Sequence, residues 1–332
     1  MDIIIYPPTI NWSFMKQRPQ QMMKQFAEKG YRVYYCNMTQ SNKEIEEIST
    51  NLYLVHNHDR WLKEELPNMR TQIKGKVGVW CSWAKLATTL SQYKPDWIIY
   101  DCVDEFVDWL KYEPEMIRVA DAIVCTAERL EKKLRRAHPD KNVYLIRNAY
   151  DQEMLLHHIE DNNLEDKQVV GYIGAWAPWL DEKLIGKLAS SMKDINIVVI
   201  GAEFGKRFNL HHIPNITFLG HKKHEELKQY IKKFSVCIIP FHVNQVTLAT
   251  NPVKMYEYLA TGKPVVSTNL PECFLCEHVD VASNHMEFIN TVKKRLRDPG
   301  ESKYRIDFAL QNTWSDRADE AIRIIKKIGD VE

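Results

Sequence analysis

A lysine and a glutamate three positions apart follow an Asn-Pro pair in the stretch "ATNPVKMYEYLATGKPVVST", residues 249–268. Asn251 suits the N-cap of a helix, and Pro252 suits the first helical position, where its missing N–H costs nothing. The free N–H groups at such a helix start bind anions, and Lys254 would add a positive charge in the first turn. The stretch therefore predicts an anion-binding site. The alternative is a solvated lysine that pairs with Glu257 at i,i+3.

A second stretch that could take part in chemistry is the acidic "DCVDEF", which follows the strand-like run "WIIY". Asp104 is the first candidate for orienting a substrate hydroxyl, and Asp101 and Glu105 are competitors. The alternative role for each of them is capping of the next helix. The two aspartates are three positions apart and form no D-x-D, so the stretch does not indicate a metal site.

Three further residues, Arg18, His56 and His58, come earlier in the chain and belong to loops that follow predicted strands. Arg18 lies in the first strand-to-helix loop and could reach a phosphate; the alternative is a surface ion pair. His56 and His58 are expected to be surface residues rather than ligands.

Strand-like and helix-like segments alternate along the first part of the chain and must position these residues. This alternation predicts a parallel sheet covered by helices on both faces, with ligands at the carboxyl ends of the strands. The strand-like runs are "DIIIYPP", "YRVYYCN", "LYLVHN", "VGVWCS", "DWIIYDCV", "DAIVCT" and "VYLIRN".

A polar, acidic segment at 151–168 contains no strand-like run and is interpreted as a connector. A second strand–helix series follows, with "VVGYIGAW", "INIVVIGA", "ITFLGH", "FSVCIIPF" and "PVVST" as its strands. The sequence thus predicts two doubly wound α/β domains, at 1–155 and 168–310, and a terminal helix within 311–332.

Composition narrows the function classes. The chain has 332 residues, 45% of them hydrophobic, and a net charge of +1, which gives no reason to expect nucleic acid as a partner. No apolar run approaches the ~20 residues that span a bilayer, and the N-terminus is not typical of a signal peptide. Seven cysteines lie mostly in strand-like runs, as reduced thiols of a cytoplasmic protein do. The single C-x-x-C, residues 273–276, is a weak metal signal.

The segment "NPVKMYEYLATGKPVVSTNLPE" resembles the donor-binding motif of GT-B glycosyltransferases of the family-4 type (group 1), most of all the teichuronic-acid and capsule biosynthesis branch. The likeness extends in the right order over nearly the whole chain. It includes "NWSFMKQRPQQMMKQFAEKGYRVYYCN", "WIIYDCVDEF", "LIRNAYD", "VVGYIGAWAPWLDEKLI", "NITFLGHKKHEEL" and "VCIIPFHVNQVTLATNPVK".

The resemblance implies a bacterial hexosyltransferase of cell-envelope polysaccharide synthesis, with the GT-B fold of two Rossmann-like domains facing a cleft. It would transfer a sugar from a nucleoside-diphosphate sugar, with UDP expected, to a glycan or lipid-linked glycan. The resemblance also implies retention of configuration, no metal, no cofactor, and a terminal helix that crosses back to the N-terminal domain. The expected location is the cytoplasm, with at most peripheral contact at the inner face of the membrane.

The resemblance assigns the donor to the C-terminal domain. Lys254 and the nearby helix start would bind the diphosphate, and Glu257 would bind the ribose hydroxyls. Gly174 would let the backbone approach the phosphates, and Leu219 with Gly220 would lie beside the base. The remaining expected donor-side residues are Trp176, Asn244, Thr250, Asn251, Pro252 and Val253. Catalytic roles are expected for Asp104, Arg18 and Lys254, and acceptor-side roles for Asn11, Trp12 and Asp101.

Two departures from the family pattern bear on the donor site. The usual glutamate eight positions before Glu257 is Ala249 here, so Asn244 or Gln245 would have to contact the donor sugar. The usual arginine and lysine after the glycine that opens the second domain are absent from "GAWAPWLD". Lys254 would then carry most of the phosphate charge, with Lys183 and Arg18 as possible helpers.

Three other functions fit parts of the sequence. A nucleotide-sugar epimerase of the same shape would use the donor site without an acceptor. A non-catalytic protein would bind the nucleotide sugar without turnover. A dehydrogenase fits poorly, because no strand-turn-helix G-x-G-x-x-G occurs and "GAEFGK" is too sparse.

Overall fold

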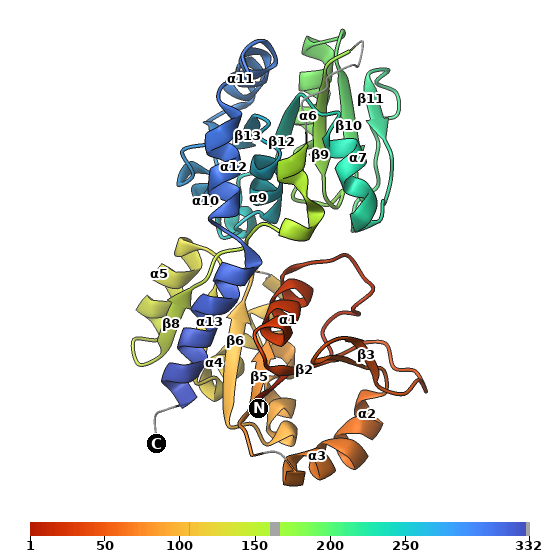
Figure 1. Ribbon diagram of the computed structural model, residues 1–332. Helices are drawn as coiled ribbons and strands as arrows, with labels where there is room; N and C mark the ends of the chain where they lie inside the picture. Colours follow the sequence, from red (N-terminus) through yellow and green to blue (C-terminus); the bar gives the residue numbers. More distant parts are fainter. Residues whose placement is uncertain (73, 106, 160–166, 330–332) are drawn as a thin grey trace. The chain divides into compact units, whose positions relative to one another are not determined.

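The computed structural model describes residues 1–72, 74–105, 107–159 and 167–329. The chain divides into two compact units (Figure 1). Unit 1 contains Met1–Arg147 and the segment from Trp314 onward, and unit 2 contains Asn148–Thr313. Unit 1 is therefore built from two separate parts of the sequence, and unit 2 from one.

Unit 1 is built on an eight-stranded sheet with the order β3-β4-β2-β1-β5-β6-β7-β8. All neighbours are parallel except β3 and β4, which are antiparallel. The strands are β1 Ile3–Tyr6, β2 Arg32–Cys36, β3 Glu46–Ser49, β4 Leu52–Val55, β5 Val77–Cys81, β6 Trp97–Cys102, β7 Ala122–Cys125 and β8 Asn142–Leu145.

Helices connect the strands of unit 1. The α-helices are α1 Arg18–Glu28, α2 His58–Arg60, α3 Leu66–Gln72, α4 Glu113–Val119, α5 Glu128–Ala137 and α13 Trp314–Gly329. The other helical segments are η1 Trp61–Glu65, η2 Ala84–Tyr93 and η3 Val107–Trp109. Helix α13 packs against α1, where Lys29 Nζ lies 2.7 Å from Asp319 Oδ1.

Unit 2 has a six-stranded, all-parallel sheet with the order β11-β10-β9-β12-β13-β14. Its strands are β9 Val169–Ile173, β10 Asn196–Ile200, β11 Ile216–Phe218, β12 Val236–Ile239, β13 Val265–Thr268 and β14 Asp280–Ala282. Its α-helices are α6 Glu182–Ser191, α7 Leu227–Ile231, α8 Gln245–Leu248, α9 Val253–Ala260, α10 Pro271–Phe274, α11 His285–Arg297 and α12 Ser302–Leu310. The shorter turns are η4 Gln152–Met154, η5 Leu156–His158 and η6 His224–Glu226.

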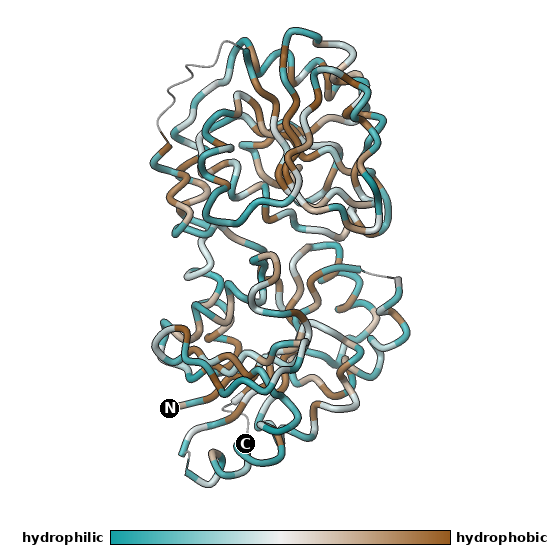
Figure 2. The backbone as a smooth tube through the Cα atoms, turned by 90° about the vertical axis from the view of Figure 1, so that its right-hand side faces the viewer, coloured by the Kyte–Doolittle hydropathy of each residue, from teal (hydrophilic) through white to brown (hydrophobic). Residues whose placement is uncertain are grey.

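The strands of both sheets are mostly buried apolar runs, as expected for parallel sheets covered on both faces. β1, β5 and β9 are buried along their whole length. Figure 2 shows the hydrophobic chain segments gathered inside each unit. The predicted α/β class with parallel sheets is confirmed.

The described part of the segment interpreted as a connector is not a free linker. Residues 151–159 form the two short turns η4 and η5, and Met154 and Leu156 are buried in the core of unit 2. These two apolar side chains anchor the turns to that core, although the residues around them are mostly polar. Residues 160–166 lie outside the described residues.

Candidate functional site

Loops that follow the strands of unit 2 form one edge of its sheet, because all six strands are parallel. The glycines after β9, β10 and β11 lie side by side at this edge: Gly174 N donates to Ile200 O at 2.8 Å, and Gly201 N donates to Gly220 O at 2.9 Å. A Cβ on Gly201 would lie 1.8 Å from Gly174 O, so no other residue fits there. Because β9 is third in the order of six strands, the Gly174 loop lies near the middle of this edge.

Lys254 reaches the same loop from the first turn of α9. A Cβ added to Gly174 would lie 2.4 Å from the Tyr172 hydroxyl and 3.3 Å from Lys254 Cε, so a side chain at 174 would clash with the tyrosine and crowd the lysine. Lys254 Nζ lies 3.6 Å from Glu257 Oε2, and the two side chains are 28% and 7% exposed. The structure thus brings Gly174, Lys254 and Glu257 together, and it contains the ion pair that the sequence offered as the alternative.

The start of α9 differs from the prediction by one residue. Pro252 is the N-cap and the helix begins at Val253, with no side-chain cap. Asn251 does not cap the helix because its side chain is used elsewhere. Its Oδ1 accepts from Asn148 N at 2.9 Å, and its Nδ2 donates to Glu272 Oε2 at 3.0 Å.

The segment before α9 forms the short helix α8. Asn244 is exposed and caps α8, because its Oδ1 accepts from Thr247 N at 3.1 Å. Thr250 donates from its hydroxyl to Val246 O at 3.0 Å. Ala249 is fully buried, so the position that carries a glutamate in the family pattern is part of the core here. Asn244 and its exposed neighbour Gln245 are on the surface of this segment.

Trp176 was expected on the donor side of the site, but its side chain is buried and presents no surface to a ligand. Its indole is 0% exposed, packs edge-on against Phe208 at 4.6 Å between ring centroids, and donates from Nε1 to Arg207 O at 3.1 Å. The ring fills the core beneath the loop. Leu219 and Gly220 do lie at the loop edge after β11, and a Cβ on Gly220 would meet nothing within 4 Å.

Arg18 and Asp101 form a buried ion pair in unit 1. Arg18 Nε donates to both carboxylate oxygens of Asp101 at 3.0 and 2.9 Å, and Trp80 Nε1 donates to Asp101 Oδ2 at 3.0 Å. The side chains are 4% and 1% exposed. Neither expected role for Arg18, phosphate contact or a surface ion pair, describes this arrangement, and Asp101 is too enclosed to touch an acceptor. Burial forces both charges to pair with each other.

The other unit 1 candidates lie closer to the surface. Asn11 joins the loop after β1 to the loop after β2, because its Nδ2 donates to Thr39 Oγ1 and its Oδ1 accepts from Thr39 N, both at 2.8 Å. Trp12 is half-buried. Asp104 is half-buried after β6, whereas Glu105 is buried and lies 2.6 Å from Lys133 Nζ. Asp104 is therefore the accessible member of the acidic stretch.

The sequence analysis missed a cluster at the N-terminus of α6. Asp181 caps this helix through Leu184 N, and His285 Nε2 lies 2.7 Å from Asp181 Oδ2, with His242 Nδ1 at 3.6 Å. Burial opposes ionisation of Asp181, but the Leu184 N–H and the His285 imidazole outweigh it and lower the pKa of the carboxyl. The "LDEKL" pattern signals the cap, but nothing local reveals two histidines that lie 61 and 104 positions away.

The remaining candidates are peripheral. Lys183 is exposed on α6. In the basic segment "HKKH", residues 221–224 after β11, His224 Nε2 lies 3.3 Å from Asp151 Oδ2, and Lys222 stacks over the ring of Tyr230. His56 is half-buried, and His58 is buried rather than on the surface, with its Nε2 2.7 Å from the hydroxyl of Tyr93.

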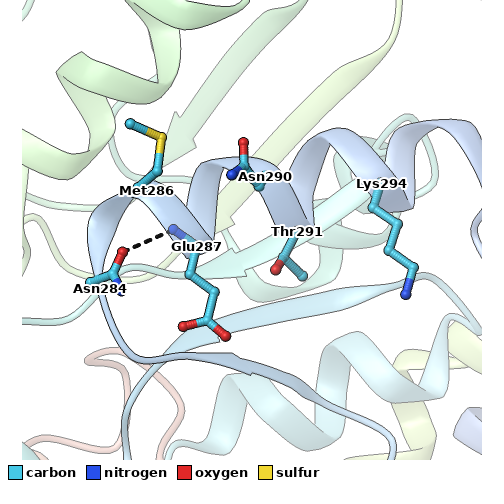
Figure 3. Close-up of a pocket in the computed structure, with 6 residues that line it drawn as sticks. All are labelled: Asn284, Met286, Glu287, Asn290, Thr291 and Lys294. Carbon is cyan, nitrogen blue, oxygen red and sulfur yellow. Dashed lines mark hydrogen bonds between the residues drawn. The ribbon is translucent and has the colours of Figure 1, made fainter.

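A surface pocket of about 510 Å³ lies on α11 (Figure 3). Its lining includes Met286, Asn290 and Lys294, and Asn284 Oδ1 accepts from Glu287 N at 3.0 Å. None of the predicted site residues lines it. The pocket is therefore separate from the Gly174–Lys254–Glu257 group.

Within the described ranges, no three His, Cys, Asp or Glu side chains cluster so as to hold a metal ion. All seven cysteines are buried and free, and burial raises the pKa of Cys273 to about 12 and of Cys276 to about 11. No helix in the described part of the chain combines the length and apolar character needed to cross a membrane.

Similarities to known proteins are consistent with this geometry. The family model for glycosyl transferases group 1 matches residues 167–298, which lie within unit 2. Over 273 residues the chain is 25% identical to TuaH of Bacillus subtilis strain 168, provisionally named a teichuronic acid biosynthesis glycosyltransferase. The match covers 71% of this chain and 68% of TuaH.

Solved structures share the fold over the whole chain. Sucrose-phosphate synthase of Thermosynechococcus elongatus is 13% identical, with a TM-score of 0.76 and full coverage of both chains. HepE of Anabaena, in complex with UDP and glucose, is 13% identical with a TM-score of 0.65, covering 98% of this chain and 99% of HepE. A glycosyltransferase of Rickettsia africae is 10% identical with a TM-score of 0.69, covering 100% and 99%. The chain is a glycosyltransferase with the GT-B fold, related through residues 167–298 to the glycosyl transferases group 1, as its sequence resemblance indicated.

Proposed function

We propose that the chain transfers a sugar from a nucleoside-diphosphate sugar to a hydroxyl of a glycan, with uridine as the base. The observation that carries the proposal is the meeting of Gly174, Lys254 and Glu257 at the loop edge of unit 2. A glycine without a side chain, a cation at a helix start and a carboxylate one turn later supply what a diphosphate joined to a ribose requires. HepE, a protein of the same fold, binds UDP and glucose, which supports the choice of base.

Each residue in this group has a proposed role. The first N–H groups of α9 and the Lys254 ammonium bind the diphosphate, and Glu257 accepts from the ribose hydroxyls. Val253 and Pro252 set the start of α9, and Asn251 fixes that start from the side. The base lies beside Leu219 and Gly220. The donor sugar faces Asn244, Gln245 or Thr250, because the buried methyl of Ala249 cannot bind it.

In the proposed reaction the bond between the anomeric carbon and the diphosphate oxygen breaks, and a bond from that carbon to the acceptor oxygen forms on the same face. The acceptor proton passes to the departing phosphate oxygen. Negative charge grows on the diphosphate as the bond breaks, and Lys254 with the α9 amides stabilises it without a metal. Retention therefore needs no strong protein base.

On the acceptor side we assign Asp104, Asn11 and Trp12, which lie in loops after β6 and β1. Asp104 would orient the acceptor hydroxyl. Arg18 and Asp101 would act from beneath as a buried support of these loops. The name of TuaH supports an acceptor in cell-envelope polysaccharide synthesis, either a glycan or a lipid-linked glycan. Such a reaction would take place in the bacterial cytoplasm, at most in peripheral contact with the inner face of the membrane.

A thermal-shift screen of nucleotide sugars, followed by turnover assays, tests the proposal. A donor at 100 times its Kd should stabilise the protein by about 2.7 kcal/mol. Product should then form only with an acceptor and should continue to form in excess chelator. Sugar conversion without an acceptor would favour an epimerase, and binding without turnover on any glycan would favour a non-catalytic protein. Turnover that is lost in chelator and restored by magnesium would exclude the metal-independent mechanism.

A further inference from the structure

A polar cavity of about 300 Å³ lies in unit 1, apart from every residue assigned above. Three chain segments enclose it: residues 42–45 before β3, residues 55–57 at the end of β4, and residues 60–65 around η1. β4 runs parallel to β2, so the cavity opens at the carboxyl edge of the sheet, where ligands of such sheets bind.

Hydrogen bonds hold the walls of this cavity in place without a ligand. Ser41 N donates to His56 O at 2.8 Å, and Gln40 Nε2 donates to Asp59 Oδ2 at 3.0 Å. Asn57 accepts from Arg60 N at 3.1 Å and so caps α2. The cavity is therefore a built feature of the fold rather than a gap between loose loops.

The lining mixes donors and acceptors and has no net formal charge. Lys43 and Arg60 are cations, Glu44 and Glu65 are carboxylates, and Asn57 both donates and accepts. Arg60 Nε also donates to Glu64 Oε2 at 2.9 Å, so the charges around the cavity do not favour an anion. A neutral group with many hydroxyls matches this set, because each hydroxyl can donate to a carboxylate and accept from a cation.

Trp61, one of the lining residues, carries a buried indole donor. Trp61 lines the cavity and is 1% exposed, and its indole Nε1 has no hydrogen-bond partner among the residues that the structure describes. Buried polar groups are nearly always hydrogen-bonded, so an orphaned one calls for an explanation. An oxygen of a bound group would provide one.

Asn37 connects the cavity to the acceptor-side loop. Its Oδ1 accepts from Trp12 N at 2.7 Å, and its Nδ2 lies 3.2 Å from His56 Nδ1. His56 Nε2 in turn lies 3.0 Å from Glu46 Oε2. In this series of hydrogen bonds, Nδ1 of His56 accepts from the Asn37 amide and Nε2 carries the proton that faces Glu46. One amide thus joins the loop of Asn11 and Trp12 to the cavity wall.

We propose that this cavity binds a neutral sugar unit of the acceptor glycan, distinct from the unit that receives the transferred sugar. The inference rests on the proposed transferase function and adds that the acceptor is longer than a monosaccharide. A volume of about 300 Å³ is at the small end of ligand sites, which fits a single sugar ring. Specificity for the acceptor glycan then comes from Glu44, Glu65 and Asn42, at a distance from the reacting atoms.

The test measures oligosaccharide binding in the absence of a donor, on an array of neutral and uronate-containing bacterial glycan fragments, followed by calorimetry on the strongest neutral binder. Asn42→Trp fills the cavity from an exposed loop position, and Glu65→Gln removes one acceptor charge with little change in shape. Glu47→Gln, in exposed β3 outside the lining, is the matched control. We expect at least 10-fold weaker binding in the first two variants and less than 2-fold change in the control.

UDP affinity and thermal unfolding are measured on the same variants, and both should stay unchanged. Equal oligosaccharide affinity in wild type, Asn42→Trp and Glu65→Gln would overturn the inference, as would binding of uronate-containing chains alone or of no glycan. Failure of the transferase proposal has a separate signature, because it would appear as absent turnover while the cavity still binds glycan.

Discussion

Lys254 and Glu257 form an ion pair at the first turn of α9, with 3.6 Å between Nζ and Oε2. The distance is beyond a hydrogen bond, so the lysine retains its donors for another partner. A diphosphate at the helix start would draw the ammonium away from Glu257 and release the carboxylate for ribose hydroxyls. Binding of the nucleotide would then exchange one partner for another at both side chains.

Lys254→Ala should weaken UDP binding at least about 10-fold, equivalent to about 1.4 kcal/mol, because the diphosphate loses its nearest cation. Isothermal calorimetry at fixed salt measures the effect. Lys232→Ala removes a charge from an exposed position at the end of α7 and serves as the control. An unchanged Kd for Lys254→Ala would remove the lysine from the donor site.

Breaking the buried ion pair of unit 1 should destabilise the protein strongly. Arg18→Met or Asp101→Asn alone should lower the free energy of unfolding by about 3–5 kcal/mol, because each leaves one charge without its buried partner. The double variant Arg18→Met/Asp101→Asn should recover a large part of this loss. Urea denaturation of the three variants measures it. A double variant as unstable as the sum of both singles would show that the two side chains do not act as a pair.

Asn251→Ala should lower stability by about 1–3 kcal/mol, because Asn148 N and Glu272 each lose a buried partner. It should also weaken UDP binding, since Asn251 fixes the start of α9. Asn244→Ala removes an exposed cap from α8 and should cost only about 1 kcal/mol. Denaturation and calorimetry on both variants separate the two effects. A loss at Asn251 no larger than that at Asn244 would contradict the positioning role.

Burial lowers the pKa of His58 below its usual value near 6.5. The unfolded chain therefore binds a proton at this residue at a higher pH than the folded chain, so stability should fall as the pH drops below about 6.5. His58→Gln should flatten this part of the curve. Denaturation at several pH values between 7.5 and 5 checks the sign. A wild type whose stability rises on acidification across this range, or a variant with the same slope, would contradict the assignment.

The long strands could be predicted from the sequence because runs such as "VVGYI" and "DWIIYDC" are continuous and apolar, as parallel strands require. Two edge strands gave no such signal. β3 reads "EEIS" and is mostly exposed, and β14 reads "DVA" and has three residues. An edge strand is held by a single neighbour and can lack an apolar run, so β3 and β14 are revealed only by the folded sheet. The other two edge strands, β8 and β11, are more apolar and could be predicted.

The candidate site could be predicted in part. The Asn-Pro-x-Lys spacing located the start of α9 to within one residue. The position of Asn251 was misjudged, because its partners at 148 and 272 are distant in sequence. The same limit explains Trp176, whose aromatic ring near a loop suits a sugar as well as a core. The residue type alone does not indicate whether an aromatic ring packs into the core or faces a ligand.

The interrupted sequence of unit 1 has a consequence for how the chain is made. α13 packs on α1, yet the ribosome completes all of unit 2 between these two helices. The continuous unit 2 can fold during synthesis, and the pairing of Tyr150 with Thr313 closes it at its two ends. Until α13 is made, the newborn unit 1 lacks the helix that packs on α1. Molecular chaperones would have their longest opportunity to act on that half of the nascent polypeptide.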